Sequence, residues 1–110
     1  MRFPWARAPK VETEDRSQEA LQLISKRLKE CEDTLRANPN DADALFTKAV
    51  FLAHIGEYWK SLNCLHLVTK LDSAYPGVWH LKSTLYQRVG DHSAAQKCRE
   101  RAHAMALVPA

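Results

Sequence analysis

The sequence of 110 residues has few glycines, few cysteines and no long uncharged apolar run. Its three glycines form no glycine-rich loop of the kind that holds phosphate groups. Its three cysteines, Cys31, Cys64 and Cys98, are an odd number without metal-type spacing, so we predict reduced thiols in a cytoplasmic protein. Because no apolar run is long enough to cross a bilayer and none follows the basic start, we predict neither a membrane segment nor a secretory signal.

The sequence also lacks a block of like charge. The net charge is +3, but basic and acidic residues alternate along the chain, so no nucleic-acid surface is predicted. The weakest alternative that we consider is an adaptor for nucleic acid or membranes that uses Arg2, Trp5, Arg7 and Lys10. Hydrophobic residues make up 45% of the chain, which is an ordinary balance for one small soluble domain.

Motifs that would carry catalysis or bind a metal are missing as well. The five histidines form no HExxH motif, and no Cys-x-x-Cys pair is present. Cys64 and His66 are two residues apart, which on a helix points them to different faces. The sequence therefore predicts no enzyme activity, no cofactor and no metal site.

Two stretches of the sequence resemble each other at a fixed spacing of 34 residues. Gly56 and Gly90 are separated by this spacing, as are Cys64 and Cys98. The same offset pairs similar residues at further positions: Leu45 with Trp79, Lys48 with Lys82, Ala49 with Ser83, Phe51 with Leu85, Leu52 with Tyr86, Ile55 with Val89, Glu57 with Asp91, Ser61 with Ala95, and Val68 with Ala102. A period of this length is typical of a helical repeat.

Each of these units has the pattern of two helices. Apolar residues recur at helical spacing from Leu45 to Ile55, and again from Leu62 to Leu71. The second unit gives a helix from Trp79 to Val89 and another over about 92–107. Gly56 and Gly90 follow the first helix of each unit, where glycine tolerates the left-handed conformation that ends a helix. No alternating strand pattern competes.

This pattern resembles the tetratricopeptide repeat, a helix–turn–helix unit of about 34 residues. The residues that carry the resemblance are Leu45, Ala49, Leu52, Gly56, Tyr58, Ser61, Leu65 and Val68, then Trp79, Ser83, Tyr86, Gly90, Ala95 and Ala102. It implies an all-α fold: a short α-solenoid of about five helices in antiparallel pairs, with repeat one at 42–75 and repeat two at 76–109. Small residues would lie where helices meet. Lys48 and Lys82 depart from the family pattern, which more often has Leu there.

The N-terminal third lies outside the resemblance. Leu21, Ile24, Leu28, Cys31 and Leu35 form one apolar stripe, which predicts a helix over 15–37. Asp15 and Gln18 are spaced as in a capping box, and Asn38 with Pro39 would end the helix. One interpretation is a helix that caps the repeat stack. The other is a short seam for dimerisation. We expect residues 1–14 to form an irregular arm.

The second unit has the more polar final helix. Where repeat one has Leu62, Leu65 and Leu67, repeat two has Gln96, Arg99 and Arg101. Because a terminal repeat needs a polar outer face, we expect residues 15–110 to form one complete short stack.

The resemblance also implies where a partner would bind. The first helices of the two units would line an inner groove with Phe46, Val50, His54, His80, Thr84 and Arg88. Phe46 and Val50 stand where the family's carboxylate clamp has Lys and Asn, so we expect a mixed apolar and basic groove instead. The predicted function is a non-enzymatic module that binds a peptide or protein. The alternative is a subunit that dimerises through the N-terminal stripe or through Trp59, which we expect to be either an exposed contact or buried under the N-terminal helix.

Overall fold

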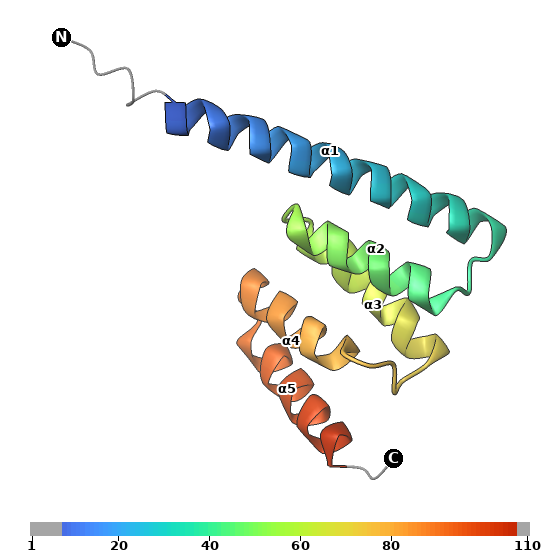
Figure 1. Ribbon diagram of the computed structural model, residues 1–110. Helices are drawn as coiled ribbons and strands as arrows, with labels where there is room; N and C mark the ends of the chain where they lie inside the picture. The colour runs from blue at the N-terminus through green and yellow to red at the C-terminus, as the bar shows by residue number, and fades with distance from the viewer. Residues whose placement is uncertain (1–7, 108–110) are drawn as a thin grey trace.

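The structure is a computed structural model that describes residues 8–107, with side chains from residue 16 onward. It contains five helices, α1 (Ala8–Ala37), α2 (Ala42–His54), α3 (Tyr58–Leu71), α4 (Val78–Val89) and α5 (His92–Ala106), and no strand within that range (Figure 1). The predicted all-α fold of about five helices is confirmed.

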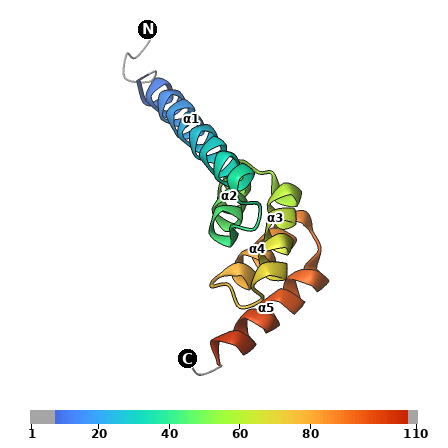
Figure 2. The ribbon, with the colours of Figure 1, turned by 90° about the vertical axis from the view of Figure 1, so that its right-hand side faces the viewer.

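Each helix packs against the next one along the chain, so the five helices form a stack (Figure 1). The pairs α2–α3 and α4–α5 make the most extensive contacts, and α3 joins the two pairs by packing on α4. The molecule is elongated, with extents of 64 × 35 × 26 Å. Much of this length comes from α1, which extends beyond the other helices (Figure 2).

Helix α1 is longer than the sequence pattern predicted. It begins at Ala8 rather than Asp15, so residues 8–14 are helical and do not belong to an irregular arm. Asp15 therefore lies inside the helix and does not cap it. The first helical turn contains Pro9, a residue that suits this position because its missing N–H needs no partner there. Residues 1–7 of the predicted arm lie outside the described range. The end at Ala37, before Asn38 and Pro39, is as predicted.

The turn inside each helix pair contains one of the two glycines that are 34 residues apart in the sequence. Gly56 and Gly90 have φ values of +82° and +86°, a left-handed conformation that side chains rarely adopt. The helices that follow begin in similar ways. Asp91 caps α5, its side chain accepting a hydrogen bond from the Ala94 amide at 3.0 Å. Asp41 caps α2 in the same way through the Ala44 amide.

Small residues occupy the closest helix contacts. Ala49, Ser61 and Ala95 are completely buried, and Ser83 and Ala102 are nearly so. Ser61 Oγ donates a hydrogen bond of 2.6 Å to the Ala49 carbonyl oxygen, which joins α3 to α2. Larger side chains fill the remaining space, and the rings of Tyr58 and Tyr86 pack against this core.

The outer end of the stack is polar, in agreement with the sequence comparison of the two units. Leu62 and Leu65 are buried between α3 and its neighbours, whereas Gln96 and Arg99 on α5 are exposed. Leu67 is itself 48% exposed, so its exchange for Arg101 marks no difference in burial. The boundaries predicted for the domain and for the two repeats stay predictions.

Candidate protein-interaction groove

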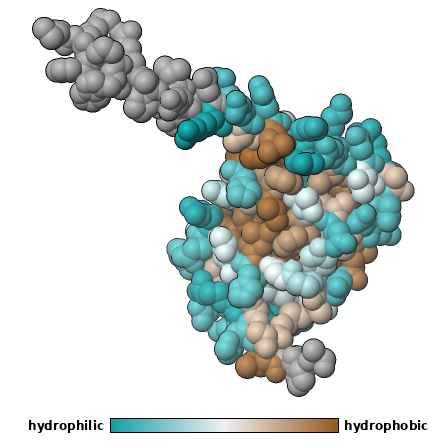
Figure 3. Space-filling model, viewed as in Figure 1, coloured by the Kyte–Doolittle hydropathy of each residue, from teal (hydrophilic) through white to brown (hydrophobic). Residues whose placement is uncertain are grey.

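A groove of about 350 Å³ lies between the two helix pairs. Four of the six residues predicted to line a binding face meet in it: Val50 and His54 from α2, and Thr84 and Arg88 from α4. The remaining lining residues are Ala53, Tyr58, Leu81 and Leu85. On the face viewed in Figure 3, hydrophobic side chains gather in the middle of the body between hydrophilic margins.

The repeat explains why these four residues meet. Val50 and Thr84 are related by the 34-residue period, and so are His54 and Arg88. On each helix the two residues are four apart and therefore share one face. Stacking two equivalent helices brings these faces to opposite sides of one groove.

The groove combines an apolar base with basic and polar groups. Leu85 is fully buried, while Val50, Ala53 and Leu81 are half-buried. His54, Thr84 and Arg88 are exposed. The lining includes no aspartate or glutamate. Arg88 forms no ion pair within the described part of the chain, so its guanidinium can offer its donors to a partner.

The other two predicted lining residues lie elsewhere. Phe46 is half-buried and packs on Tyr75 in the loop before α4, with ring centroids 4.9 Å apart. Tyr75 in turn donates a hydrogen bond to Asp43 on α2, which together with burial raises the pKa of Tyr75 to about 12. His80 is exposed and faces α5 rather than α2. Phe46 therefore fixes the loop between the helix pairs instead of lining the groove.

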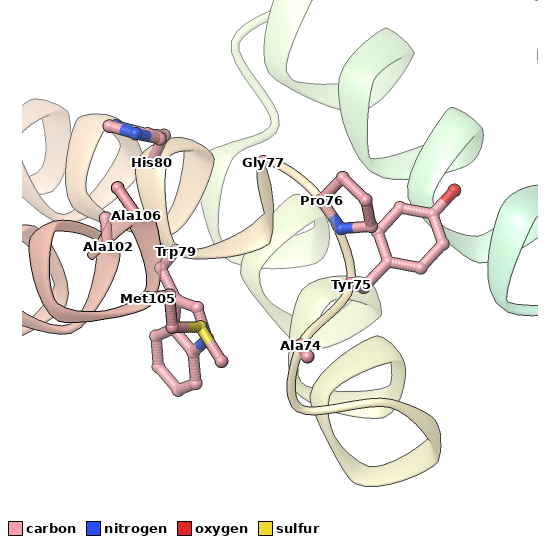
Figure 4. A pocket seen from close by; sticks show the side chains of 9 residues that line it. All are labelled: Ala74, Tyr75, Pro76, Gly77, Trp79, His80, Ala102, Met105 and Ala106. Atoms are coloured by element: carbon pink, nitrogen blue, oxygen red, sulfur yellow. The ribbon is translucent and has the colours of Figure 1, made fainter. Parts of the chain in front are cut away.

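A second pocket, of about 250 Å³, lies between that loop, α4 and α5 (Figure 4). Trp79 and Met105 line one side of it. The Trp79 ring is already engaged, because the cationic ends of Lys82 and Arg101 lie 4.6 and 5.1 Å from the ring centre. Its indole N–H also donates to the Ser73 carbonyl oxygen at 2.8 Å. These contacts make Trp79 a structural residue that joins α4 to the preceding loop and to α5.

The Trp79 contacts also explain one departure from the family pattern. Lys82 is only 5% exposed, and burial lowers the pKa of its ammonium group. Its stem lies in the helix contact, where the family more often has Leu, and its charged end reaches the Trp79 ring and Thr69 Oγ1 at 3.4 Å. The sequence showed the unusual lysine but not the aromatic partner.

The cysteines do not form a reactive site. All three are free and buried. Burial is the largest cause that raises the pKa of Cys31, Cys64 and Cys98, and a thiol with a raised pKa is a poor nucleophile. Among the residues that the structure describes, no group of three or more histidine, cysteine or acidic side chains is placed to hold a metal ion.

Trp59, at the start of α3, is a further contact candidate. It is 60% exposed, which decides between the two sequence interpretations: α1 does not bury it. Leu67 and Leu71 on the same helix are also exposed, at 48% and 44%. None of the helices within 8–107 is long and apolar enough to span a bilayer.

The stacked helix pairs and the groove between them define a helical-repeat protein. Residues 30–63 match the family model described as Tetratricopeptide repeat, and the helical architecture agrees with this similarity. The matched segment runs from the last turns of α1 through α2 into α3, so it begins before the repeat predicted at 42–75. No curated protein matches the chain. Repeats of this family generally mediate protein–protein interaction and are typically not enzymes.

Proposed function

We propose that the protein is a non-enzymatic adaptor whose groove binds an acidic peptide segment of a protein partner. The observation that carries this proposal is the composition of the groove. Val50 and Leu81 provide apolar surface, Arg88 provides a cation without an ion pair among the described residues, and the lining contains no carboxylate. A peptide that places an acidic side chain beside an apolar one would complement both parts.

The expected contacts follow from the geometry of the groove walls. An apolar side chain of the peptide would pack on Val50 and Leu81. The carboxylate of the neighbouring acidic side chain would accept hydrogen bonds from Arg88. His54 lies across the groove, at the position that the repeat makes equivalent to Arg88. The Thr84 hydroxyl donates to the His80 carbonyl oxygen at 3.1 Å, so Thr84 would contribute mainly as an acceptor.

A peptide library displayed on phage tests this proposal even though the partner is unidentified. We expect selection on the full chain to enrich peptides that have an acidic residue next to a large apolar one. Arg88→Ala should weaken binding of a selected peptide by about tenfold or more, because a hydrogen bond to a charged group contributes about 1.5–3 kcal/mol.

Arg36→Ala is the matched control. Arg36 is an exposed arginine on α1 that pairs with Asp33 at 2.9 Å and lies outside the groove lining. This control should keep full affinity, because it removes the same charge from another surface. Equal losses of peptide affinity in both variants would show that the effect comes from the overall charge of the protein and not from the groove. Unchanged affinity in Arg88→Ala, or enrichment of basic peptides, would contradict the proposal.

The cytoplasm is the compartment that we propose for this adaptor. The argument is the presence of three free and buried thiols, which suits a reducing environment. Fractionation of cells that produce the protein, with an antibody against it, would test this location. Recovery with secreted proteins would contradict it.

A further inference from the structure

The α4–α5 pocket is a further hollow of the molecule, with a volume of about 330 Å³. Its lining includes His80 and Thr84 from α4, and Arg99 and His103 from α5. Thr84 also lines the groove, so the two hollows adjoin along α4. A peptide that lies in the groove can therefore reach the α4–α5 pocket.

The antiparallel packing of α4 and α5 explains why these side chains meet (Figure 1). Arg99 on α5 donates a hydrogen bond of 3.3 Å to Gln87, which is three residues after Thr84 on α4. His103 is one turn after Arg99, on the same face of α5. Because the two helices run in opposite directions, this turn of α5 lies towards His80. The two histidines and Arg99 therefore line one hollow.

Arg99 carries a positive charge that no described carboxylate neutralises. Its guanidinium donates hydrogen bonds to the side-chain oxygens of Gln87 and Gln96, at 3.3 and 2.9 Å. Both acceptors are neutral, so they orient the guanidinium without cancelling its charge. Within residues 16–107 Arg99 forms no ion pair. Since a guanidinium has five N–H donors, others remain for an anion.

The two histidines add further donors to the α4–α5 pocket. His80 and His103 are both exposed, and neither forms an ion pair in the described part of the chain. An imidazole donates from one ring nitrogen when it is neutral and from both when it is protonated. An anion nearby favours the protonated form. The pocket can thus offer an anion one guanidinium and two imidazole groups.

The groove and the α4–α5 pocket share one sign of charge. Neither lining contains any of the 13 acidic residues of the chain. By contrast, the lining of a hollow of about 400 Å³ between α1 and α2 includes Glu30, Asp41 and Asp43. Side chains that can carry positive charge occur throughout the joined surface: His54, His80, Arg88, Arg99 and His103. This surface is therefore complementary to a ligand with more than one negative charge.

We infer that the α4–α5 pocket binds a second anionic side chain of the peptide that occupies the groove. This inference rests on the proposed peptide binding and specifies the partner further. Thr84 and His80 are four and eight residues from Arg88, which is about 6 and 12 Å along α4. An extended peptide advances about 3.3 Å per residue, so the two anionic residues should be about two to four positions apart. The second anion is a carboxylate or a phosphate, because both accept hydrogen bonds from guanidinium and imidazole groups.

Variants of a peptide from the library selection test this inference. Asp or phosphoserine at the second anionic position should bind about three- to tenfold more tightly than Gln there, since exposed charged contacts contribute modestly. Arg99→Ala should abolish this preference, and His103→Gln should reduce it. Lys97→Ala is the matched control and should keep the preference, because Lys97 is exposed on α5 but lies outside the pocket lining. Of the two anions, the one that gains more from Arg99 is the natural ligand group.

The results separate this inference from the proposed function. Affinity that depends on Arg88 but is equal for the anionic and the Gln peptides would overturn the inference and leave peptide binding in the groove intact. A preference that survives Arg99→Ala would also overturn it. If the selection yields no peptide, an NMR titration of the full chain with inorganic phosphate decides. We then expect saturable shifts at His80, Arg99 and His103 but none at His92, which is exposed on α5 outside the pocket lining. Absence of these shifts would overturn the anion site.

Discussion

The pairs α2–α3 and α4–α5 have the same internal packing but different outer surfaces. Ala49 and Ser83 occupy equivalent positions on the first helices, and both are buried. On the second helices, Leu65 is fully buried, while its equivalent Arg99 is exposed. The contact inside a pair is thus set by the repeat itself, and the outer surface depends on whether another helix pair follows. α4 covers α3, whereas no described helix covers the outer face of α5.

The largest expected effect distinguishes the covered outer face of α3 from the exposed outer face of α5. Leu65→Ala should lower the free energy of unfolding by about 2–5 kcal/mol, because it leaves a cavity in the core. Arg99→Ala, at the equivalent exposed position, should change it by no more than about 0.5 kcal/mol. Urea unfolding followed by circular dichroism measures both. Similar losses in the two variants would contradict the idea that only one of these surfaces is covered.

The next effect concerns the close helix contact that is found inside each of the two pairs. Ala49→Leu should cost about 1–3 kcal/mol, since it overfills a completely buried helix contact. Ser83→Leu, at the equivalent position of the second pair, should also destabilise. Thermal melts of both variants compare the two contacts directly. If either substitution leaves the melting temperature unchanged, the two pairs do not pack in the same way.

A smaller effect concerns the hydrogen bond from Ser61 on α3 to α2, at a position where the second pair has an alanine. Ser61→Ala removes the 2.6 Å hydrogen bond to the Ala49 carbonyl oxygen and creates the residue that the second pair has at Ala95. We expect a loss of about 0.5–1.5 kcal/mol in the free energy of unfolding, the usual contribution of one hydrogen bond. A gain in stability would show that the alanine of the second pair is the better fit in both.

The smallest expected effect concerns the loop between the pairs. The pKa of Tyr75 is raised to about 12, first by its hydrogen bond to Asp43 and then by burial, above an ordinary value of about 10. The folded state thus favours the protonated hydroxyl, so its stabilising contribution is complete below about pH 10 and is lost as the pH rises towards 12. Tyr75→Phe should therefore lose less stability over this window, as measured by melts at each pH. An identical pH dependence would contradict the role of this hydrogen bond.

The helices and their internal contacts could be predicted from the sequence because they depend on local pattern. The period linking Gly56 to Gly90 marks both turns, and the small residues such as Ala49 and Ala95 mark the close contacts. The start of α1 could not be predicted, because Ala8–Glu14 has no apolar periodicity that distinguishes a helix from an arm.

The groove was only partly predictable for a different reason. Helical spacing placed Val50, His54, Thr84 and Arg88 on one side, and the four residues line one groove, since that placement depends on the period of a single helix. It could not separate Phe46 from this set. The position of Phe46 depends on Tyr75, in a loop whose path is set by tertiary contacts.

An NMR titration of the isotope-labelled chain with a peptide from the library selection tests directly whether the groove is the binding surface. We expect the amide shifts to concentrate at the groove residues Val50, His54, Thr84 and Arg88, with little change around Trp59 and Leu21. Shifts confined to Trp59 and the exposed face of α3, or to α1, would contradict peptide binding in the groove and would place the partner on another surface of the protein.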